Sequence, residues 1–181
     1  MSIFIPEKHW WRDPLDKDEK VWLAIALTTS IVLTLAMPYW HVTQKQNPGS
    51  EYYKIKPDTF DAATDRFIQQ YGVKDEAGAI KQEGGIDVVA PPPGDVFVRG
   101  QQFKWSPVLK LKKGSEYRIH LSSIDVLHGF SVQPINMNFE AVPGYDYVLK
   151  VTPTTSGVFN IVCNEFCGIG HHTMVGRIYV D

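Results

Sequence analysis

The chain has 181 residues, of which 44% are hydrophobic and 21% charged, and its formal net charge is −2. This length suits one domain of ordinary size with an extension. The near-zero charge argues against a nucleic-acid-binding protein, which usually carries clustered Lys and Arg. Two cysteines are too few for a small scaffold held together by disulfides.

A run of twenty uncharged residues extends from Val21 to Trp40. As a helix it would be about 30 Å long, which is the thickness of the hydrocarbon core of a bilayer. Trp22 and Tyr39 stand near its two ends, where aromatic side chains favour the membrane interface. A buried amphipathic helix is disfavoured because the apolar residues occur on all faces, and a cleaved signal peptide because a charged segment precedes the run. We therefore predict a single transmembrane helix over 21–40, and the slight excess of Lys and Arg before it over those that follow it favours a cytoplasmic segment over 1–20.

Residues 41–85 are predicted to be a connector that contains a short amphipathic helix. The helix would begin at Pro57–Asp58, with Asp58 as N-cap, and end at Gly72. Its apolar residues fall on one face: Phe60, Ala63, Phe67, Ile68 and Tyr71. Two interpretations stay open, since this face would suit either the membrane surface or a partner subunit, or else the domain that follows.

From Ile86 onward the pattern is that of short β-strands separated by turn residues. The strand-like runs are 96–98, 117–121, 145–151, 158–162 and 175–180. Strands at this spacing without intervening helices predict an all-β domain over 86–181, a Greek-key sandwich or barrel.

The residues that carry chemistry are gathered in one stretch of twelve, from Cys163 to Met174. It contains two thiols, a thioether and two imidazoles, a set of soft ligands that suits copper or zinc better than magnesium or calcium. A disulfide between Cys163 and Cys167 would close an awkwardly short loop, and zinc gains little from a Met. The stretch therefore favours a metal site.

A further ligand is expected upstream of this stretch. His9 and His41 flank the apolar run, and His120 lies in an alternating strand where a half-buried structural role is the simpler interpretation. His128 follows the end of a predicted strand and precedes a glycine, which is a loop position typical of sites. We therefore expect His128 to complete the ligand set.

Three motifs together resemble subunit II of cytochrome c oxidases. They are Asp125-Val-Leu-His128-Gly-Phe130, then Asn138-Phe-Glu-Ala-Val-Pro143-Gly144, then Cys163-x-Glu-x-Cys167-Gly-x-Gly-His171-x-x-Met174, and the likeness extends upstream to Gln102-Phe-Lys-Trp105. The single anchor and the short chain are most similar to the form found in B-type (ba-like) heme–copper oxidases.

The resemblance implies a cupredoxin-like β-domain with a binuclear copper A centre of two copper ions. Cys163 and Cys167 would bridge the coppers, and His128 and His171 would each bind one of them. Met174 and the backbone carbonyl of Glu165 would be weak axial ligands. The Glu165 side chain would help to hold a magnesium or manganese ion at a subunit interface, while His172 falls outside the pattern.

The resemblance also implies a function. The chain would be the electron-entry subunit of an oxidoreductase, accepting electrons from a c-type cytochrome or small redox protein and passing them to heme in the catalytic membrane subunit, which reduces oxygen. Phe103 and Trp105 would lie near the electron-entry surface, with ordinary core packing as the alternative. The domain would face the periplasm or outer side of a bacterial or archaeal cell membrane, and a copper-insertion factor would load it while its thiols are reduced.

Residues 86–181 carry eight acidic and eight basic side chains, so we expect donor docking with modest salt dependence. Three other functions compete with the leading one. The chain would fit a copper A subunit of a nitric oxide reductase of the same superfamily, a structural subunit that has lost copper, or a membrane-tethered copper-delivery protein. The structural subunit is disfavoured because all of the ligand positions are filled.

Overall fold

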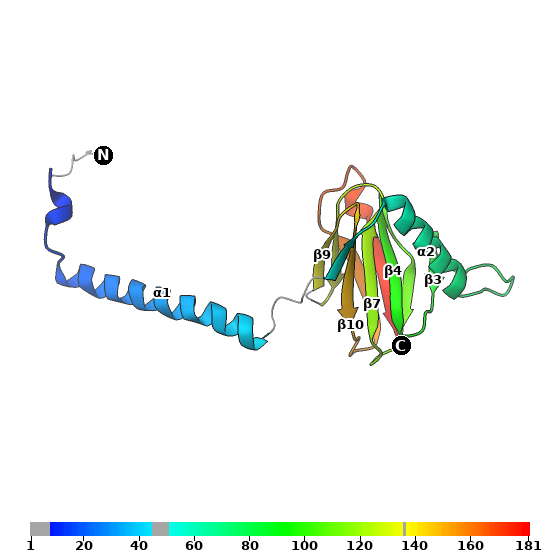
Figure 1. Ribbon diagram of the computed structural model, residues 1–181, viewed down its shortest axis with the longest axis horizontal. Helices are drawn as coiled ribbons and strands as arrows, with labels where there is room; N and C mark the ends of the chain where they lie inside the picture. Colours follow the sequence, from blue (N-terminus) through cyan, green and yellow to red (C-terminus); the bar gives the residue numbers. More distant parts are fainter. Residues whose placement is uncertain (1–7, 45–50, 136) are drawn as a thin grey trace. The chain divides into compact units, whose positions relative to one another are not determined.

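The structure is a computed structural model that describes residues 8–44, 51–135 and 137–181 (Figure 1). The chain divides into two compact units, Met1–Gly49 and Ser50–Asp181. The first seven residues of the predicted N-terminal segment, and residues 45–50 of the predicted connector, lie outside the described residues.

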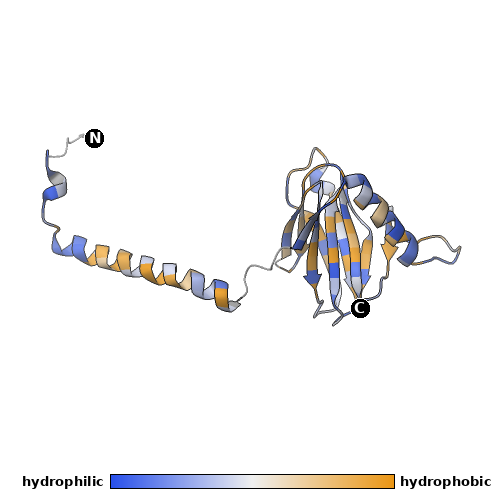
Figure 2. Ribbon diagram, in the orientation of Figure 1, coloured by the Kyte–Doolittle hydropathy of each residue, from blue (hydrophilic) through white to orange (hydrophobic). Residues whose placement is uncertain are grey.

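The first unit contains a short 3₁₀ turn, η1 (Trp10–Arg12), and one long helix, α1 (Lys17–Gln44). The helix starts four residues before the predicted span because Asp16 and Glu19 cap it reciprocally: the Glu19 N–H donates to Asp16 Oδ1 at 2.8 Å, and the Asp16 N–H donates to Glu19 Oε2 at 3.1 Å. After a hydrophilic first turn, apolar residues recur along most of the helix (Figure 2). Over Lys17–Thr43 the helix is long and apolar enough to cross a membrane.

The second unit is built on two β-sheets. The five-stranded sheet has the order β1 (Glu51–Lys54), β10 (Tyr145–Val151), β7 (Tyr117–Ser123), β4 (Gly94–Gln101), β5 (Lys104–Ser106). The seven-stranded sheet has the order β2 (Gln82–Glu83), β3 (Ile86–Val89), β6 (Val108–Leu111), β12 (Val175–Val180), β11 (Gly157–Cys163), β8 (His128–Gln133), β9 (Met137–Ala141). A second helix, α2 (Pro57–Tyr71), and a 3₁₀ turn, η2 (His171–Thr173), complete the unit.

The strands form where buried side chains alternate with side chains on the outer face of the sheet. In β4 the residues Val96 and Val98 are buried between the sheets, whereas Phe97 points to the outer face. β7 repeats this pattern in parallel register with β4, with Ile119 and Leu121 inside. The predicted β-sandwich is therefore confirmed, although three of its strand pairs, β4–β7, β3–β6 and β6–β12, are parallel.

Helix α2 packs on the outer face of the five-stranded sheet. The rings of Phe60 and Phe67 lie 5.8 and 5.7 Å from the ring of Phe97. Of the two interpretations left open by the sequence, the structure selects packing on the following domain. The predicted N-cap was wrong: the cap is Lys56, because Pro57 occupies the first turn, where its missing N–H costs nothing.

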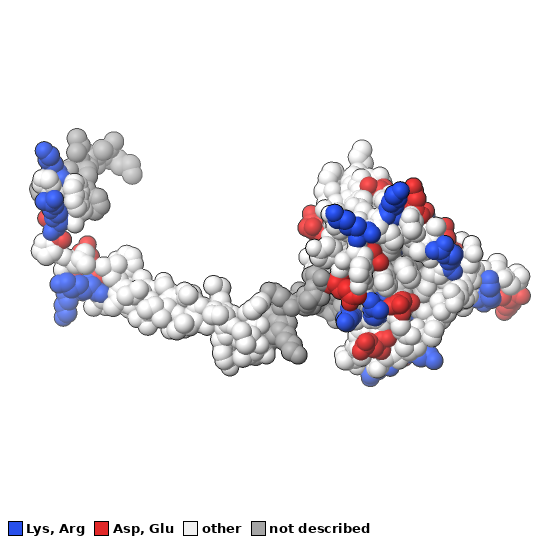
Figure 3. All heavy atoms as spheres, in the orientation of Figure 1, with Lys and Arg blue, Asp and Glu red and all other residues white. Residues whose placement is uncertain are grey.

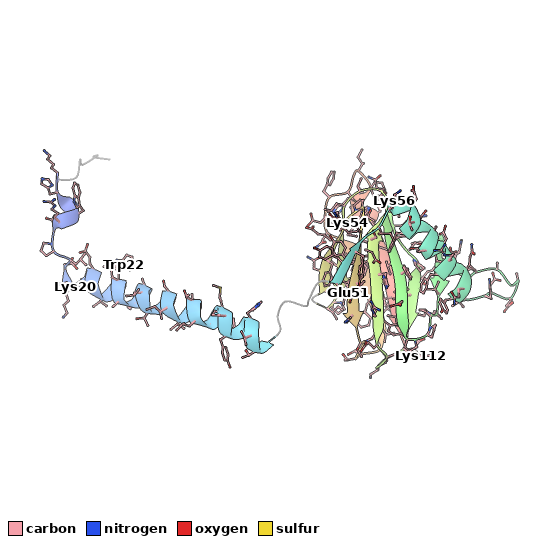
Figure 4. All side chains as sticks on the ribbon, viewed as in Figure 1. Lys20, Trp22, Glu51, Lys54, Lys56 and Lys112 are labelled. Carbon is pink, nitrogen blue, oxygen red and sulfur yellow. The ribbon has the colours of Figure 1, made fainter. Side chains whose placement is uncertain are left out.

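Strand β1 makes the segment before α2 part of the sheet as well. It pairs with β10 in antiparallel register, and Figure 4 labels Glu51 and Lys54 at its two ends. Glu51 receives hydrogen bonds from Arg118 at 2.8 Å and from the Tyr53 hydroxyl at 2.7 Å. The compact domain thus begins near residue 50, and the predicted boundary at residue 86 was wrong. The single-sequence pattern missed this because β1 is a four-residue edge strand with mostly exposed side chains.

The corrected boundary also changes the charge of the domain. Residues 51–181 carry 15 acidic and 13 basic side chains, a net charge of −2, so the domain is weakly acidic rather than neutral. Figure 3 shows acidic and basic side chains interspersed over the visible face of the domain.

Candidate metal centre

The connection between β11 and β12, residues 163–174, is hereafter called the metal loop. It lies at the end of the domain opposite the C-terminus (Figure 1). β11 and β12 pair up to Val162 and Val175, and the Cys163 N–H donates to the Met174 carbonyl at 3.1 Å. The loop therefore starts and ends on a closed hairpin, which holds its first and last residues side by side.

All six predicted ligand residues meet at this loop. The Sγ atoms of Cys163 and Cys167 are 3.8 Å apart, and both cysteines are free. His128 Nδ1 lies 3.9 Å from Cys163 Sγ, while His171 Nδ1 lies 3.6 Å from Cys167 Sγ. The two imidazoles thus approach different ends of the thiol pair. Met174 Sδ is 3.9 Å from Cys167 Sγ, and the Glu165 carbonyl oxygen is 3.3 Å from Cys163 Sγ.

These separations fit a soft metal. Metal–sulfur and metal–nitrogen bonds of about 2.3 and 2.0 Å allow two donors to share one ion when they lie within about 4.3–4.6 Å of each other. Each neighbouring pair above satisfies that limit, and His128, Cys163 and Cys167 all lie within 4.8 Å of one another. The sulfur–sulfur distance is far longer than the bond of about 2.05 Å in a disulfide. The donor set therefore fits copper, the metal that thiolates, imidazoles and a thioether favour together.

His128 occupies a different place from the one predicted. It is the first residue of β8 and pairs with Ala141 of β9, so it lies in a strand and is fully buried rather than in a loop. Glycine suits the next position because a Cβ on Gly129 would come within 2.8 Å of the backbone N of Glu165 in the metal loop.

The glycines of the metal loop act in two ways. Gly168 has φ +135°, a conformation that side chains rarely adopt, so glycine lets the chain turn tightly there. Gly170 does not have a positive φ; instead, a Cβ there would come within 2.4 Å of Phe103 Cδ2. Its role is to let the Phe103 ring lie against the loop.

Phe103 and Trp105 lie in different surroundings. Gln102 and Phe103 form the turn between β4 and β5, and Phe103 is half-buried on the metal loop. Trp105 lies in β5 and is fully buried, with its ring 5.8 Å from that of His128 in edge contact. Phe103 is thus partly accessible from outside, whereas Trp105 lies behind the site.

The electrostatics of the site favour a protonated Cys167 thiol in the metal-free chain. Burial, and next the hydrogen bond with Cys163, raise the pKa of Cys167 to about 11. A metal must therefore displace a proton from this thiol as it binds. Burial opposes ionisation of Asp125, but hydrogen bonds from the Gln102 N–H and the His128 ring outweigh it and lower the pKa of that carboxyl.

Two residues near the site were not singled out from sequence. Asp125 accepts a hydrogen bond from His128 Nε2 at 2.8 Å, and Gln102 donates its side-chain amide to the Cys167 carbonyl. Both stand inside the motifs that carried the family resemblance, and that is the signal that could have found them. His172 is exposed, as expected of a residue outside the ligand set.

The two-sheet sandwich and a Cys–Cys–His–His–Met donor set at one end define a cupredoxin-like domain with a copper-type site. The sequence profile of the family "Cytochrome C oxidase subunit II, periplasmic domain" matches residues 101–180. A cytochrome c oxidase subunit 2 of Thermus thermophilus is 31% identical over 166 residues, which cover 90% of each chain. A second one from the same species is 35% identical over 135 residues, covering 74% of this chain and 90% of the relative.

A comparison with solved structures identifies a similar fold. A chain of a heme–copper terminal oxidase dimer superimposes with a TM-score of 0.56 at 24% identity, covering 91% of this chain and 100% of that one. The chain belongs to the cytochrome c oxidase subunit II family, the electron-entry subunits of heme–copper oxidases. The predicted family and the predicted cupredoxin-like sandwich with one N-terminal helix are thereby confirmed.

Proposed function

We propose that this chain accepts electrons at a binuclear copper A centre and delivers them to heme in the catalytic subunit of a membrane-bound terminal oxidase that reduces oxygen to water. The observation that carries the proposal is the thiol pair: two sulfurs 3.8 Å apart, with one imidazole beside each. A mononuclear copper site needs only one thiolate, whereas a second thiolate in the same loop allows two ions to be bridged.

In this proposal Cys163, Cys167, His128 and His171 would hold the two copper ions, and Met174 and the Glu165 carbonyl would be weaker donors to them. Two copper ions held by shared thiolates would supply one-electron transfer spread over both metals, with little change of bond length and therefore fast transfer. The chain's own part is to hold these donors rigidly before the metal arrives. Two paired strands and the hydrogen bond from Cys163 N–H to the Met174 carbonyl serve that purpose.

We propose that a c-type cytochrome or small redox protein docks on the metal loop mainly through apolar contact. Phe166 and Ile169, at the tip of the loop, are 80% and 96% exposed. Large apolar side chains this exposed are typical of contact surfaces when they stand together. The half-buried Phe103 ring against the loop is the better candidate for electron entry, since Trp105 is fully buried.

Because the domain has a net charge of only −2, turnover should depend modestly on salt, and a steep loss of turnover between low and moderate salt would contradict this.

The remaining partners follow from the same function. α1 would be the single membrane anchor, with residues 1–20 on the cytoplasmic side and the domain on the periplasmic or outer side of the cell membrane. The exposed Glu165 side chain would face the catalytic subunit, where a magnesium or manganese ion would need its other ligands from that subunit. A copper-insertion factor would have to load the site while both thiols are reduced.

The test is metal analysis and electron paramagnetic resonance of the full chain purified in detergent after copper loading. Two coppers per chain with a mixed-valence spectrum would support the proposal, whereas one copper, zinc or no metal would overturn it. Comparing oxygen with nitric oxide turnover of the purified complex separates the oxidase from the nitric oxide reductase alternative, because the chemistry of the gas belongs to the catalytic subunit.

A further inference from the structure

The Asp125 carboxylate, beside the metal loop, is hydrogen-bonded to the proposed ligand His128 through Nε2, the ring nitrogen that does not face the thiols. Asp125 lies three residues before His128, and its Oδ1 is 2.8 Å from His128 Nε2. An ionised carboxylate can only accept hydrogen bonds, so this contact requires the ring hydrogen on Nε2. The other nitrogen, Nδ1, faces Cys163 Sγ at 3.9 Å and then carries the free lone pair. The ring therefore presents to the thiols the one nitrogen that can bind a metal.

The second oxygen of the Asp125 carboxylate is connected to Cys167 through hydrogen bonds of Gln102. Asp125 Oδ2 accepts the backbone N–H of Gln102 at 2.7 Å. The Gln102 side-chain amide in turn donates to the carbonyl of Cys167. Asp125 is thus linked directly to a ligand in β8 and, through one residue, to a ligand in the metal loop.

The neighbours of the His128 ring restrict its position but do not select its protonated nitrogen. Trp105 lies edge-on to the ring with the planes at 68°, and a Cβ on Gly100 would come within 3.0 Å of His128 Cδ2. These contacts are apolar or steric, and they would accept either placement of the ring hydrogen. Only a polar partner at Nε2 distinguishes the two.

From these contacts we propose that Asp125 is a positioning residue for the copper site. It fixes which nitrogen of His128 faces the metal, and it anchors the Gln102 turn that steadies Cys167. The proposal rests on the proposed copper function. A carboxylate on the far nitrogen also makes a metal-binding imidazole a stronger donor, and removal of such a partner typically weakens metal binding by about 10- to 100-fold. Because the stronger donor favours the oxidised metal, its loss should move the reduction potential to more positive values.

The test compares Asp125→Asn with Glu116→Gln in the full chain in detergent. Glu116 is an exposed carboxylate just before Tyr117, at the opposite end of β7, about 20 Å away at 3.3 Å per strand residue. We expect Asp125→Asn to bind copper about 10- to 100-fold more weakly in competition with a chelator and to raise the reduction potential. Glu116→Gln should match the original chain in both. If Asp125→Asn also matches it while the original chain binds two coppers, the positioning role is overturned; if the original chain binds no copper pair, the proposed function itself fails.

A second measurement needs no variant to fold. Nuclear magnetic resonance of the metal-free original chain, labelled with ¹⁵N-histidine, reports which ring nitrogen of His128 carries the hydrogen. We expect a protonated Nε2 whose hydrogen exchanges slowly with water, as its burial and its carboxylate partner require. A hydrogen on Nδ1 instead would overturn the proposal whatever the copper content.

Discussion

Phe103 and Gly170 are in such close contact that a methyl group on Gly170 would come within 2.4 Å of the Phe103 ring. Gly170→Ala must therefore push the ring away from the metal loop. We expect a loss of about 1–3 kcal/mol in the free energy of unfolding of the metal-free chain, the usual cost of overpacking. Chemical denaturation followed by circular dichroism measures it.

A double-mutant cycle supplies the control for this contact. In a Phe103→Ala chain the ring atoms nearest to a methyl group at residue 170 are gone, so the second substitution should cost clearly less than it does alone. Equal costs in the two backgrounds would mean that the ring does not lie on Gly170. If Phe103 is also the entry point for electrons, Phe103→Ala should slow electron uptake from the donor while leaving the copper spectrum unchanged.

The position of α2 predicts where the domain can be cut. Phe60 and Phe67 are 0% and 5% exposed and stand against Phe97, and burying each such ring stabilises by about 1.5–3 kcal/mol. A fragment 51–181 should fold and unfold cooperatively on heating. A fragment 86–181, which lacks β1 and α2, should melt at a clearly lower temperature or aggregate. Equal melting temperatures of the two fragments would show that residues 51–85 do not stabilise the domain.

That boundary marks the limit of what could be predicted from the sequence. The metal loop was predictable because its donors are chemically rare and stand within twelve residues of each other, and the buried strands because β4 and β7 alternate cleanly. Strand β1 could not be predicted, since its side chains are mostly exposed and its stability comes from pairing with β10, far along the chain. The hydrophobic face of α2 was visible, but its partner Phe97 was not, because a helical pattern does not say what covers it.

The site shows the same division. The soft donors of the metal loop were visible from their types and spacing, and the family resemblance implied the full ligand set, whereas the support of these residues depends on contacts between segments distant in sequence. Gln102 reaches Cys167 across 65 positions, and Asp125 reaches the Gln102 turn across 23. No local sequence pattern indicates such a long-range hydrogen bond. His128 was expected in a loop for a similar reason, because its pairing with Ala141 defines the strand.

His120 predicts a pH dependence of stability. Burial opposes its charge, but the Asp146 carboxylate, at 2.7 Å from Nδ1, and Asp95 outweigh burial and raise the pKa of His120. A raised pKa means that the charged ring stabilises the fold fully below the unfolded value of about 6.5, and that this contribution is lost as pH rises through the folded value. The melting temperature of the metal-free chain should therefore contain a component that falls from about pH 6.5 upward.

Replacement of that ring isolates the component. His120→Gln removes the charge, so the fall above about pH 6.5 should flatten relative to the original chain. His172→Gln, which changes an exposed histidine, should leave the profile as it is. If both variants keep the full slope, the pH dependence arises elsewhere and the pairing of His120 with Asp146 contributes nothing measurable.

The thiol pair predicts the consequence of losing one sulfur. Cys163 is 4% exposed, and serine is close to it in size, so Cys163→Ser should fold while one bridging donor is removed. We expect copper to fall below two per chain and the mixed-valence spectrum to disappear, because a hydroxyl is a poor soft ligand. His172→Ala is the matched control, since it removes an exposed imidazole next to His171 and should retain two coppers. A Cys163→Ser chain that keeps two coppers and an unchanged spectrum would show that the two sulfurs, although only 3.8 Å apart, do not bridge.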